Sequence, residues 1–295
     1  MIVLFLVTYQ PVGTHVNNYF MAPSPARKLW KSNGLPPHRY RQPLELHTFL
    51  LLFAGGTLAG VINVIVGGAG FMTFPLLVAA GMSEIEANAS NFVAVMPANV
   101  VGTYAYRSEL ASVRKHLGLR LVLAALGGIL GSTILIYTGQ ASFQKAIPWL
   151  LLFATFSFSV GPLLKSRLEH YFNFDGSRWL WLSFILEFLV YVYGGYFGLG
   201  MGILMFTIYA LFTSMNLHQA NALRNITISL MTLISIVIFA RAGVIRLGPA
   251  VVMMSGAILG SYFAAKIAKR VDPRLVRNGI LVWAIILTAF AFWKY

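Results

Sequence analysis

The glycine cluster Gly-Gly-Ala-Gly at residues 67–70 lies inside an apolar segment and recurs as Gly-Leu-Gly-Met-Gly at residues 198–202. Each cluster is followed by an asparagine-rich segment, which reads Ala-Asn-Ala-Ser-Asn at 87–91 and Ala-Asn-Ala-Leu-Arg-Asn at 220–225. Further on, Gly-Gly-Ile-Leu-Gly-Ser at 127–132 is echoed by Gly-Ala-Ile-Leu-Gly-Ser at 256–261. Glycine-broken apolar segments at matching places in two halves are typical of transporters with a substrate site between repeats. The sequence therefore predicts two homologous repeats.

The composition excludes a soluble globular protein. Hydrophobic residues make up 58% of the chain and charged residues 10%, and the mean hydropathy is +0.75. Too few polar groups remain to cover a soluble domain. The formal charge of +14 is spread between apolar segments, so it predicts loop anchors and no nucleic-acid binding. The absence of cysteine excludes a disulfide framework and a thiolate metal site. We expect an all-α, polytopic, integral membrane protein.

A membrane-spanning helix needs about 20 apolar residues. On this basis we expect eight transmembrane helices near 46–66, 84–104, 118–139, 145–164, 178–195, 217–240, 247–265 and 274–293. Two shorter apolar stretches, near 69–81 and 198–214, follow the glycine clusters. They are predicted to be short or re-entrant segments, because broken backbone survives at membrane depth only inside protein or beside a wet cavity.

The chain divides into four predicted parts. Residues 1–45 form a basic, proline-rich tail that is expected to be disordered, and its positive charge favours a cytoplasmic amino terminus. The first transmembrane repeat covers 46–165, a connecting loop covers 166–178, and the second repeat covers 179–295.

Capping signals locate two helix starts. Ser83 with Glu86, and Asn216 with Gln219, have the spacing of capping boxes, so a helix is predicted to begin just before each asparagine-rich segment. Helical spacing then places Asn88 with Asn91, and Asn221 with Arg224, on shared faces. The unpaired N–H groups and dipole of a helix start attract anions. These polar faces therefore predict the wall of a substrate pathway, with interhelical hydrogen bonding as the structural alternative.

Two charged residues in apolar surroundings are candidates for function. Arg224 is predicted to bind an anion, and its alternative role is a snorkelling anchor at a helix end. Glu187 is an acidic residue deep in the span from Trp179 to Gly194, where it can carry a coupling proton or form a structural pair with a buried polar neighbour. Tyr193 and Tyr196 flank the second glycine break, which makes them further candidates. The glycine pairs of 127–131 and 256–260 predict close helix packing instead.

The candidate site residues lie in or beside the glycine clusters and the asparagine-rich segments. The substrate-binding candidates are Asn63, Gly68, Gly70, Asn88, Ser90, Asn91, Tyr193, Tyr196, Gly200, Gly202, Asn221, Arg224 and Asn225, and the ion-coupling candidate is Glu187. No catalytic residue, metal ligand or cofactor is predicted, because the chain lacks His-Glu-x-x-His and Gly-x-Ser-x-Gly motifs and any cluster of acids and histidines in the apolar region.

An ordered set of motifs crosses both halves. It comprises Asn63 with 67–70 and Pro75, the segment Ala-Ser-Asn-Phe-Val-Ala from 89 followed by Pro97, Tyr-Ala-Tyr-Arg-Ser-Glu-Leu at 104–110, and the segments 193–202 and 220–225. With these motifs the chain resembles the sulfite exporter TauE/SafE family over about residues 46–294. Many relatives look to have lysine at the position of Arg224, and the arginine keeps the charge while favouring bidentate contact with an oxyanion. Leu199 is bulkier than the small residue that is often found there.

The resemblance implies a permease for small anions such as sulfite or organosulfonates, driven by an ion gradient and working by alternating access between the repeats. It also implies a bacterial cytoplasmic membrane. The expected partners are the anion, a coupling proton or sodium ion and the lipid bilayer, and large apolar faces are compatible with a homodimer. Two alternatives stay open: a transporter or channel for a cation or another small solute that uses Glu187, and a membrane scaffold without transport.

Overall fold

The structure is a computed structural model that describes residues 44–65, 68–114, 116–171, 180–213, 215–267 and 273–295. The described residues are helical with short connections and contain no strand. The predicted tail falls almost wholly on residues 1–43, which lie outside the described residues, as do Val66, Gly67 and most of the predicted connecting loop.

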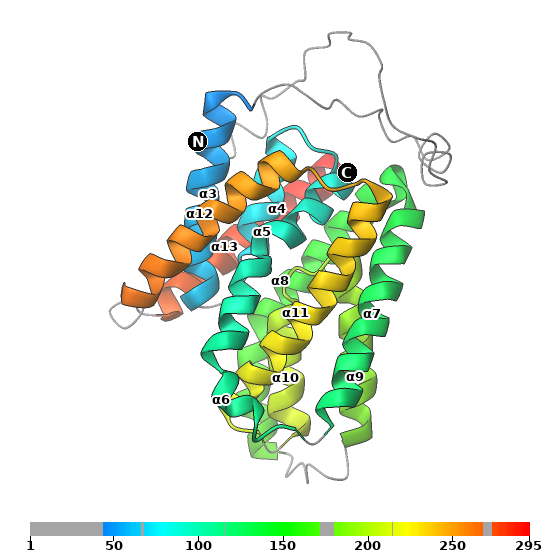
Figure 1. Ribbon diagram of the computed structural model, residues 1–295, viewed down its shortest axis with the longest axis vertical. Coiled ribbons are helices and arrows are strands. Elements are labelled where there is room, and N and C mark those ends of the chain that lie inside the picture. The colour runs from blue at the N-terminus through cyan, green and yellow to red at the C-terminus, as the bar shows by residue number, and fades with distance from the viewer. Residues whose placement is uncertain (1–43, 66–67, 115, 172–179, 214, 268–272) are drawn as a thin grey trace.

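The helices follow the predicted order along the chain (Figure 1). They are α3 (Leu46–Ile65), α4 (Gly70–Ala79), α5 (Glu84–Ala105), α6 (Arg107–Leu110), α7 (Leu117–Thr138), α8 (Gln140–Tyr171), α9 (Leu180–Tyr196), α10 (Met201–Phe212), α11 (Leu217–Ala242), α12 (Leu247–Ile267) and α13 (Pro273–Lys294).

Six helices in the described part are long and apolar enough to cross a membrane: α3, α7, α8, α11, α12 and α13. This confirms an all-helical, multi-pass membrane protein. The two other expected spans correspond to α5 and α9. Helix α9 has 17 residues, and α5 carries Glu84, Glu86 and several asparagines, which lower its mean hydropathy. The predicted short segments are α4 and α10, with 10 and 12 residues.

Both predicted capping boxes are confirmed. The Ser83 hydroxyl accepts from the Glu86 backbone N–H at 3.4 Å, and the Glu86 carboxylate accepts from the Ser83 N–H at 3.1 Å. At α11 the Asn216 side chain accepts from the Gln219 N–H at 2.9 Å, and Gln219 reaches back to the Asn216 N–H at 3.0 Å. These caps satisfy the first N–H groups of α5 and α11 and fix where the asparagine-rich turns begin.

Helices α5 and α11 cross the middle of the molecule side by side in opposite directions (Figure 1). Near the start of α5 the Phe92 ring meets the Phe239 ring near the end of α11, with centroids 5.3 Å apart. Near the end of α5 the Thr103 hydroxyl lies 3.2 Å from the Ser229 hydroxyl. The two asparagine-rich segments therefore start from opposite ends of the molecule.

Small residues join helices from different halves. A Cβ added to Gly260 of α12 would lie 1.9 Å from the Thr57 carbonyl oxygen of α3, and one added to Gly256 would lie 2.2 Å from the Phe53 carbonyl oxygen. In the same way, a Cβ on Gly131 of α7 would lie 2.1 Å from the Val192 carbonyl oxygen of α9. The glycines therefore allow backbone-to-backbone contact, which confirms the predicted close packing. Helix α3 packs closely against α12, and α7 packs closely against α9.

Helix α13 satisfies two backbone carbonyls that prolines leave free. Because proline has no N–H, Pro75 in α4 gives no donor to the Phe71 carbonyl, and Pro162 in α8 gives none to the Phe158 carbonyl. The Trp283 Nε1–H donates to the Phe71 oxygen at 3.0 Å, and the Arg277 guanidinium donates to the Phe158 oxygen at 3.3 Å. Helix α13 thus fastens a broken helix to a long one.

Candidate functional site

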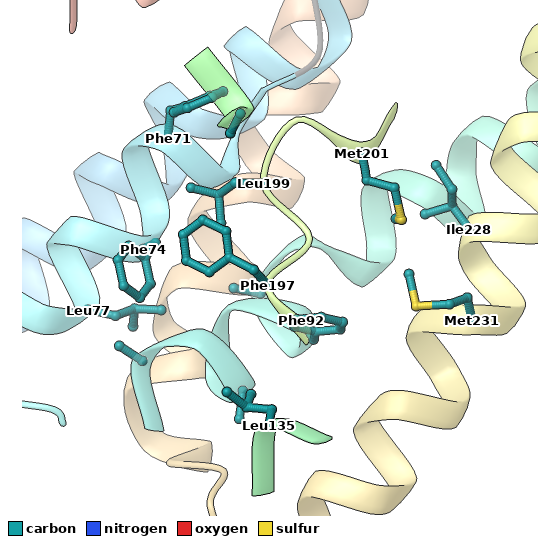
Figure 2. Packing of buried hydrophobic residues seen from close by; sticks show 14 of the residues in the cluster. Phe71, Phe74, Leu77, Phe92, Leu135, Phe197, Leu199, Met201, Ile228 and Met231 are labelled. Carbon is teal, nitrogen blue, oxygen red and sulfur yellow. The ribbon is translucent and has the colours of Figure 1, made fainter. Parts of the chain in front are cut away.

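The two broken helices begin close to each other in the interior. The side chain of Leu199, just before α10, lies against Gly70 at the start of α4, where an added Cβ would be 3.1 Å from the leucine Cγ. The Phe74 ring of α4 packs edge-on against Phe197, with centroids 5.6 Å apart. Figure 2 shows Phe197 and Leu199 reaching from the α9–α10 connection toward the aromatic residues of α4. The two helix starts are therefore separated by apolar side chains.

The start of α10 is the more open of the two. Gly200 takes a left-handed backbone (φ +76°), which turns the chain into the helix. A Cβ added to Gly202 would have one neighbour within 4 Å, the Arg224 Nη1 at 3.9 Å. The half-buried side chain of Arg224 thus lies beside the first turn of α10. In that turn the Met201 and Ile203 N–H groups donate to the Gly198 and Gly200 carbonyls at 3.3 and 3.1 Å, so the Gly202 N–H is the donor that the described contacts leave for a ligand. The Arg224 Nη2 also donates to the Asn225 amide oxygen at 3.4 Å.

The start of α4 has an amide in place of the arginine. Gly68 has a φ of +92°, and a Cβ on Gly70 would lie 3.6 Å from the Asn91 Nδ2. The Asn91 side-chain oxygen accepts from the Thr73 hydroxyl at 2.5 Å, which fixes the amide beside the helix start. Asn91 and Arg224 therefore occupy comparable places beside α4 and α10, but only one of them carries a charge.

Other predicted residues hold the break between α9 and α10. The fully buried Asn88 donates to the Tyr196 carbonyl at 2.9 Å, and its side-chain oxygen has no hydrogen-bond partner in the described structure. The Tyr193 hydroxyl donates to the Leu199 carbonyl at 2.6 Å. Asn225 packs against Gly102 of α5, where an added Cβ would be 2.6 Å from its Nδ2. The contacts of Asn88 and Tyr193 set the shape of the glycine turn, and that of Asn225 packs α11 against α5.

Three predicted residues lie elsewhere or contribute less directly. The Ser90 hydroxyl accepts from the Arg246 backbone N–H at 2.9 Å, which ties α5 to the connection between α11 and α12. Asn63 is half-buried on α3, and Asn221 is half-buried in the second turn of α11.

Glu187 forms a buried ion pair with Arg120 of α7, and the two side chains are 0% and 1% exposed. The Tyr209 hydroxyl of α10 donates to the other Glu187 oxygen at 3.4 Å, and the Tyr191 hydroxyl lies 3.2 Å from that of Tyr209. Sequence reasoning missed Arg120. The available signal was an arginine that begins an otherwise apolar span, but nothing in the sequence links it to a glutamate 67 residues later.

A second charged group lies at the start of α5. The nearly buried Glu84 accepts hydrogen bonds from Gln140, Gln144 and Tyr295, and Glu86 pairs with Arg246 at 3.3 Å. Burial raises the pKa of Tyr295 above its usual range, and the Glu84 carboxylate raises it further. This cluster connects the start of α5 to α8, to the connection between α11 and α12, and to the end of α13.

The chemistry available at α10 suits an anion. Arg224 supplies a planar cation that can donate more than one hydrogen bond, and the helix start supplies the Gly202 N–H and the positive end of the dipole. In the described residues no group of three or more histidines, cysteines or carboxylates could hold a metal ion.

Comparison with known proteins gives consistent results. The family model described as "Sulfite exporter TauE/SafE" matches residues 52–291. A probable membrane transporter protein of Haemophilus influenzae is 27% identical over 244 residues, which cover 81% of this chain and 92% of the relative. The probable membrane transporter protein YfcA of Escherichia coli K12 is 24% identical over 243 residues, covering 81% of this chain and 87% of the relative. No solved structure matches the chain.

The family match spans α3 to α13 and includes both glycine clusters and both asparagine-rich segments. Both relatives are named as probable membrane transporter proteins, which agrees with the multi-pass helical fold. The chain therefore belongs to the TauE/SafE sulfite exporter family.

Proposed function

We propose that this protein is a secondary active permease for small sulfur oxyanions, sulfite or organosulfonates, in a bacterial cytoplasmic membrane. The observation that carries the proposal is the position of Arg224, whose guanidinium lies beside Gly202 in the first turn of α10. An oxyanion there would meet the positive charge of Arg224, the Gly202 N–H and the positive end of the α10 dipole together.

The substrate-binding site is proposed at the start of α10, between Gly202 and Arg224, rather than at the start of α4. Leu199 fills the space beside Gly70, and the oxygen of Asn91 is already engaged by Thr73. By contrast, Gly202 has only the Arg224 guanidinium within 4 Å of its added Cβ. A charge-assisted hydrogen bond contributes about 1.5–3 kcal/mol, so two such bonds are enough for binding in the micromolar to millimolar range.

Alternating access is proposed to involve two repeats, residues 46–165 and 179–295, with eight crossings formed by α3, α5, α7, α8, α9, α11, α12 and α13. The opposite directions of α5 and α11 and the paired broken helices support this arrangement. Because α3 is joined to α12 and α7 to α9, each rigid body would combine helices from both repeats. The two bodies would then move about the α5–α11 crossing.

The competing idea that Glu187 coordinates a cation substrate is less well supported. Its carboxylate is already neutralised by Arg120, so a cation would have to displace the guanidinium to bind there. Sodium coupling and dimerisation remain compatible with the anion proposal.

The proposed function is tested by binding and uptake with Arg224→Ala. Purified protein would be screened by thermal shift against sulfite, sulfate, thiosulfate, sulfoacetate and taurine, because a ligand of the folded state raises its apparent stability. Uptake of radiolabelled sulfite would then be measured in proteoliposomes. We expect Arg224→Ala to weaken binding by at least about 10- to 150-fold, the equivalent of one charged hydrogen bond, and to abolish uptake.

Arg241→Ala is the matched control, because Arg241 is exposed in the last turn of the same helix. It should leave binding and uptake unchanged. Normal uptake by a well-folded Arg224→Ala protein would remove Arg224 from the substrate site and would contradict the proposal.

A further inference from the structure

The Arg120–Glu187 pair is the most deeply buried charged group in the described structure. It is not part of the proposed anion-binding site beside Gly202 and Arg224. Polar groups from α7, α9, α10 and α11 surround Glu187. Arg120 faces Glu187 from α7 and Tyr209 faces it from α10, while Ser183 and Tyr191 share α9 with it. From α11, Thr227 lies beside both phenols.

These groups connect the ion pair to the anion-binding site. The Glu187 carboxylate accepts from the Tyr209 hydroxyl, and the Thr227 hydroxyl, which lies beside that phenol, donates at 3.1 Å to the backbone carbonyl of Arg224. Along α10, Tyr209 is seven residues after Gly202, which is roughly 10 Å of helix. Glu187 is thus linked through the buried Tyr209 side chain to a point on α10 about two turns from Gly202, and this rise is taken as the separation between the two sites.

The surroundings of Arg120 bear on what happens when Glu187 is neutral. A buried ion pair is weak evidence for a role in stability, but a buried charge that loses its partner needs other contacts. The Arg120 Nε–H is buried without a hydrogen-bond partner in the described residues, which leaves one donor unused. The guanidinium carbon lies 4.9 Å from the Phe184 ring centre and 5.2 Å from that of Tyr209. Those ring faces can keep Arg120 in place when the carboxylate is neutral.

We propose that Glu187 is the proton-binding group of a proton–anion symporter and that Arg120 is its counter-charge. The inference rests on the proposed function. When Glu187 is ionised, the pair is electrically neutral. When its carboxylate takes a proton, Arg120 is left with an uncompensated positive charge near the anion-binding site, and that charge favours the binding of an anion. Proton binding and anion binding then reinforce each other reciprocally, which is the condition for symport.

The size of the coupling follows from Coulomb's law. Two unit charges roughly 10 Å apart in a medium of effective dielectric constant about 20 change a binding equilibrium by about tenfold. Protonation of Glu187 should therefore raise anion affinity about tenfold.

The test uses methanesulfonate, whose charge stays constant between about pH 6 and about pH 8, since sulfonic acids are far stronger acids than any protein side chain. Affinity is measured for the purified full chain at both pH values, and exchange and uphill accumulation are measured in proteoliposomes. Wild-type protein should bind more tightly at the lower pH and accumulate methanesulfonate when a proton gradient is imposed.

Two variants separate the charges. Glu187→Gln fixes the state with an uncompensated Arg120, so its affinity should be high and independent of pH. It should keep exchange and lose proton-driven accumulation. The double variant Arg120→Gln/Glu187→Gln removes both charges. Its affinity should not depend on pH and should equal the low affinity that wild type has at the higher pH. This second variant also covers the case in which the single variant folds poorly.

His116 is the matched control for other sources of pH dependence. It is exposed one turn before Arg120, and its ring packs on Phe184 with centroids 5.7 Å apart. Since its φ is +66°, asparagine is the suitable replacement. His116→Asn should keep the wild-type pH response, and a response lost in this variant would overturn the assignment to Glu187.

Other outcomes are equally decisive. A pH response retained in both glutamine variants would overturn the proposal, and so would loss of exchange in Glu187→Gln protein that remains folded and monodisperse. If wild-type protein neither binds nor exchanges any of the sulfur oxyanions, the proposed function itself falls. Intact wild-type exchange with an unchanged pH response in the variants overturns the coupling alone.

Discussion

The variant Gly202→Ala is expected to impair substrate binding without impairing folding. The added methyl would meet only the Arg224 Nη1, at 3.9 Å, which is an ordinary van der Waals distance. No backbone has to move, and replacing glycine by alanine within a helix stabilises it by up to about 1 kcal/mol. The variant is therefore expected to fold at least as well as wild type.

The same methyl occupies the space in which an oxyanion would contact the first turn of α10. A hydrogen-bonded oxygen lies about 2.9 Å from its nitrogen donor, and a methyl between the helix and the guanidinium prevents that approach. Loss of one charge-assisted bond costs about 1.5–3 kcal/mol, so sulfite affinity should fall about 10- to 150-fold. Affinity is measured by thermal shift or calorimetry, and transport by uptake into proteoliposomes.

Gly279→Ala is the control for this experiment. Gly279 lies in α13 with nothing within 4 Å of its added Cβ, so it offers the same gain in helix stability away from the substrate-binding site. Wild-type sulfite affinity in Gly202→Ala protein would refute the placement of the anion at α10. A large fall in the thermal stability of that variant would refute the packing argument instead.

Two further predictions concern the fold. Gly260→Ala should destabilise the protein by about 1–3 kcal/mol, because its Cβ would lie 1.9 Å from the Thr57 carbonyl oxygen; unfolding in detergent should show no such loss for Gly279→Ala. Trp283→Phe should cost about 1–3 kcal/mol because it leaves the Phe71 carbonyl of α4 without a donor, whereas Trp293→Phe, at a side chain that is 76% exposed, should be close to neutral by the same measurement.

Much of the helix pattern could be predicted from the sequence. The expected span 84–104 corresponds to Glu84–Ala105, and the expected span 118–139 corresponds to Leu117–Thr138. Both rest on local signals: an apolar run long enough to cross a bilayer, and, for α5, a capping box that fixes the first turn. The glycine clusters likewise indicated where α4 and α10 begin, because glycine supplies the left-handed backbone at Gly68 and Gly200.

The tertiary partners could not be predicted in this way. Glu187 was recognised as unusual, but its partner Arg120 lies on another helix, and no spacing rule connects them. Helical periodicity placed Asn88 and Asn91 on one face, yet the structure has them hydrogen-bonded to different helices, to Tyr196 and to Thr73. A periodicity gives the direction of a side chain from its own helix and says nothing about which helix it meets.

The pairing of α3 with α12 has a consequence for synthesis. Gly60 of α3 contacts Ser261, which is 201 residues later in the chain. At about 5–20 residues per second, a ribosome needs roughly 10–40 s to make that interval. During this time the glycine face of α3 is in the membrane without its partner helix. Helix α3 is thus packed long after it is made, so a ribosome that stops before α12 leaves a chain in which α3 has an open face toward lipid.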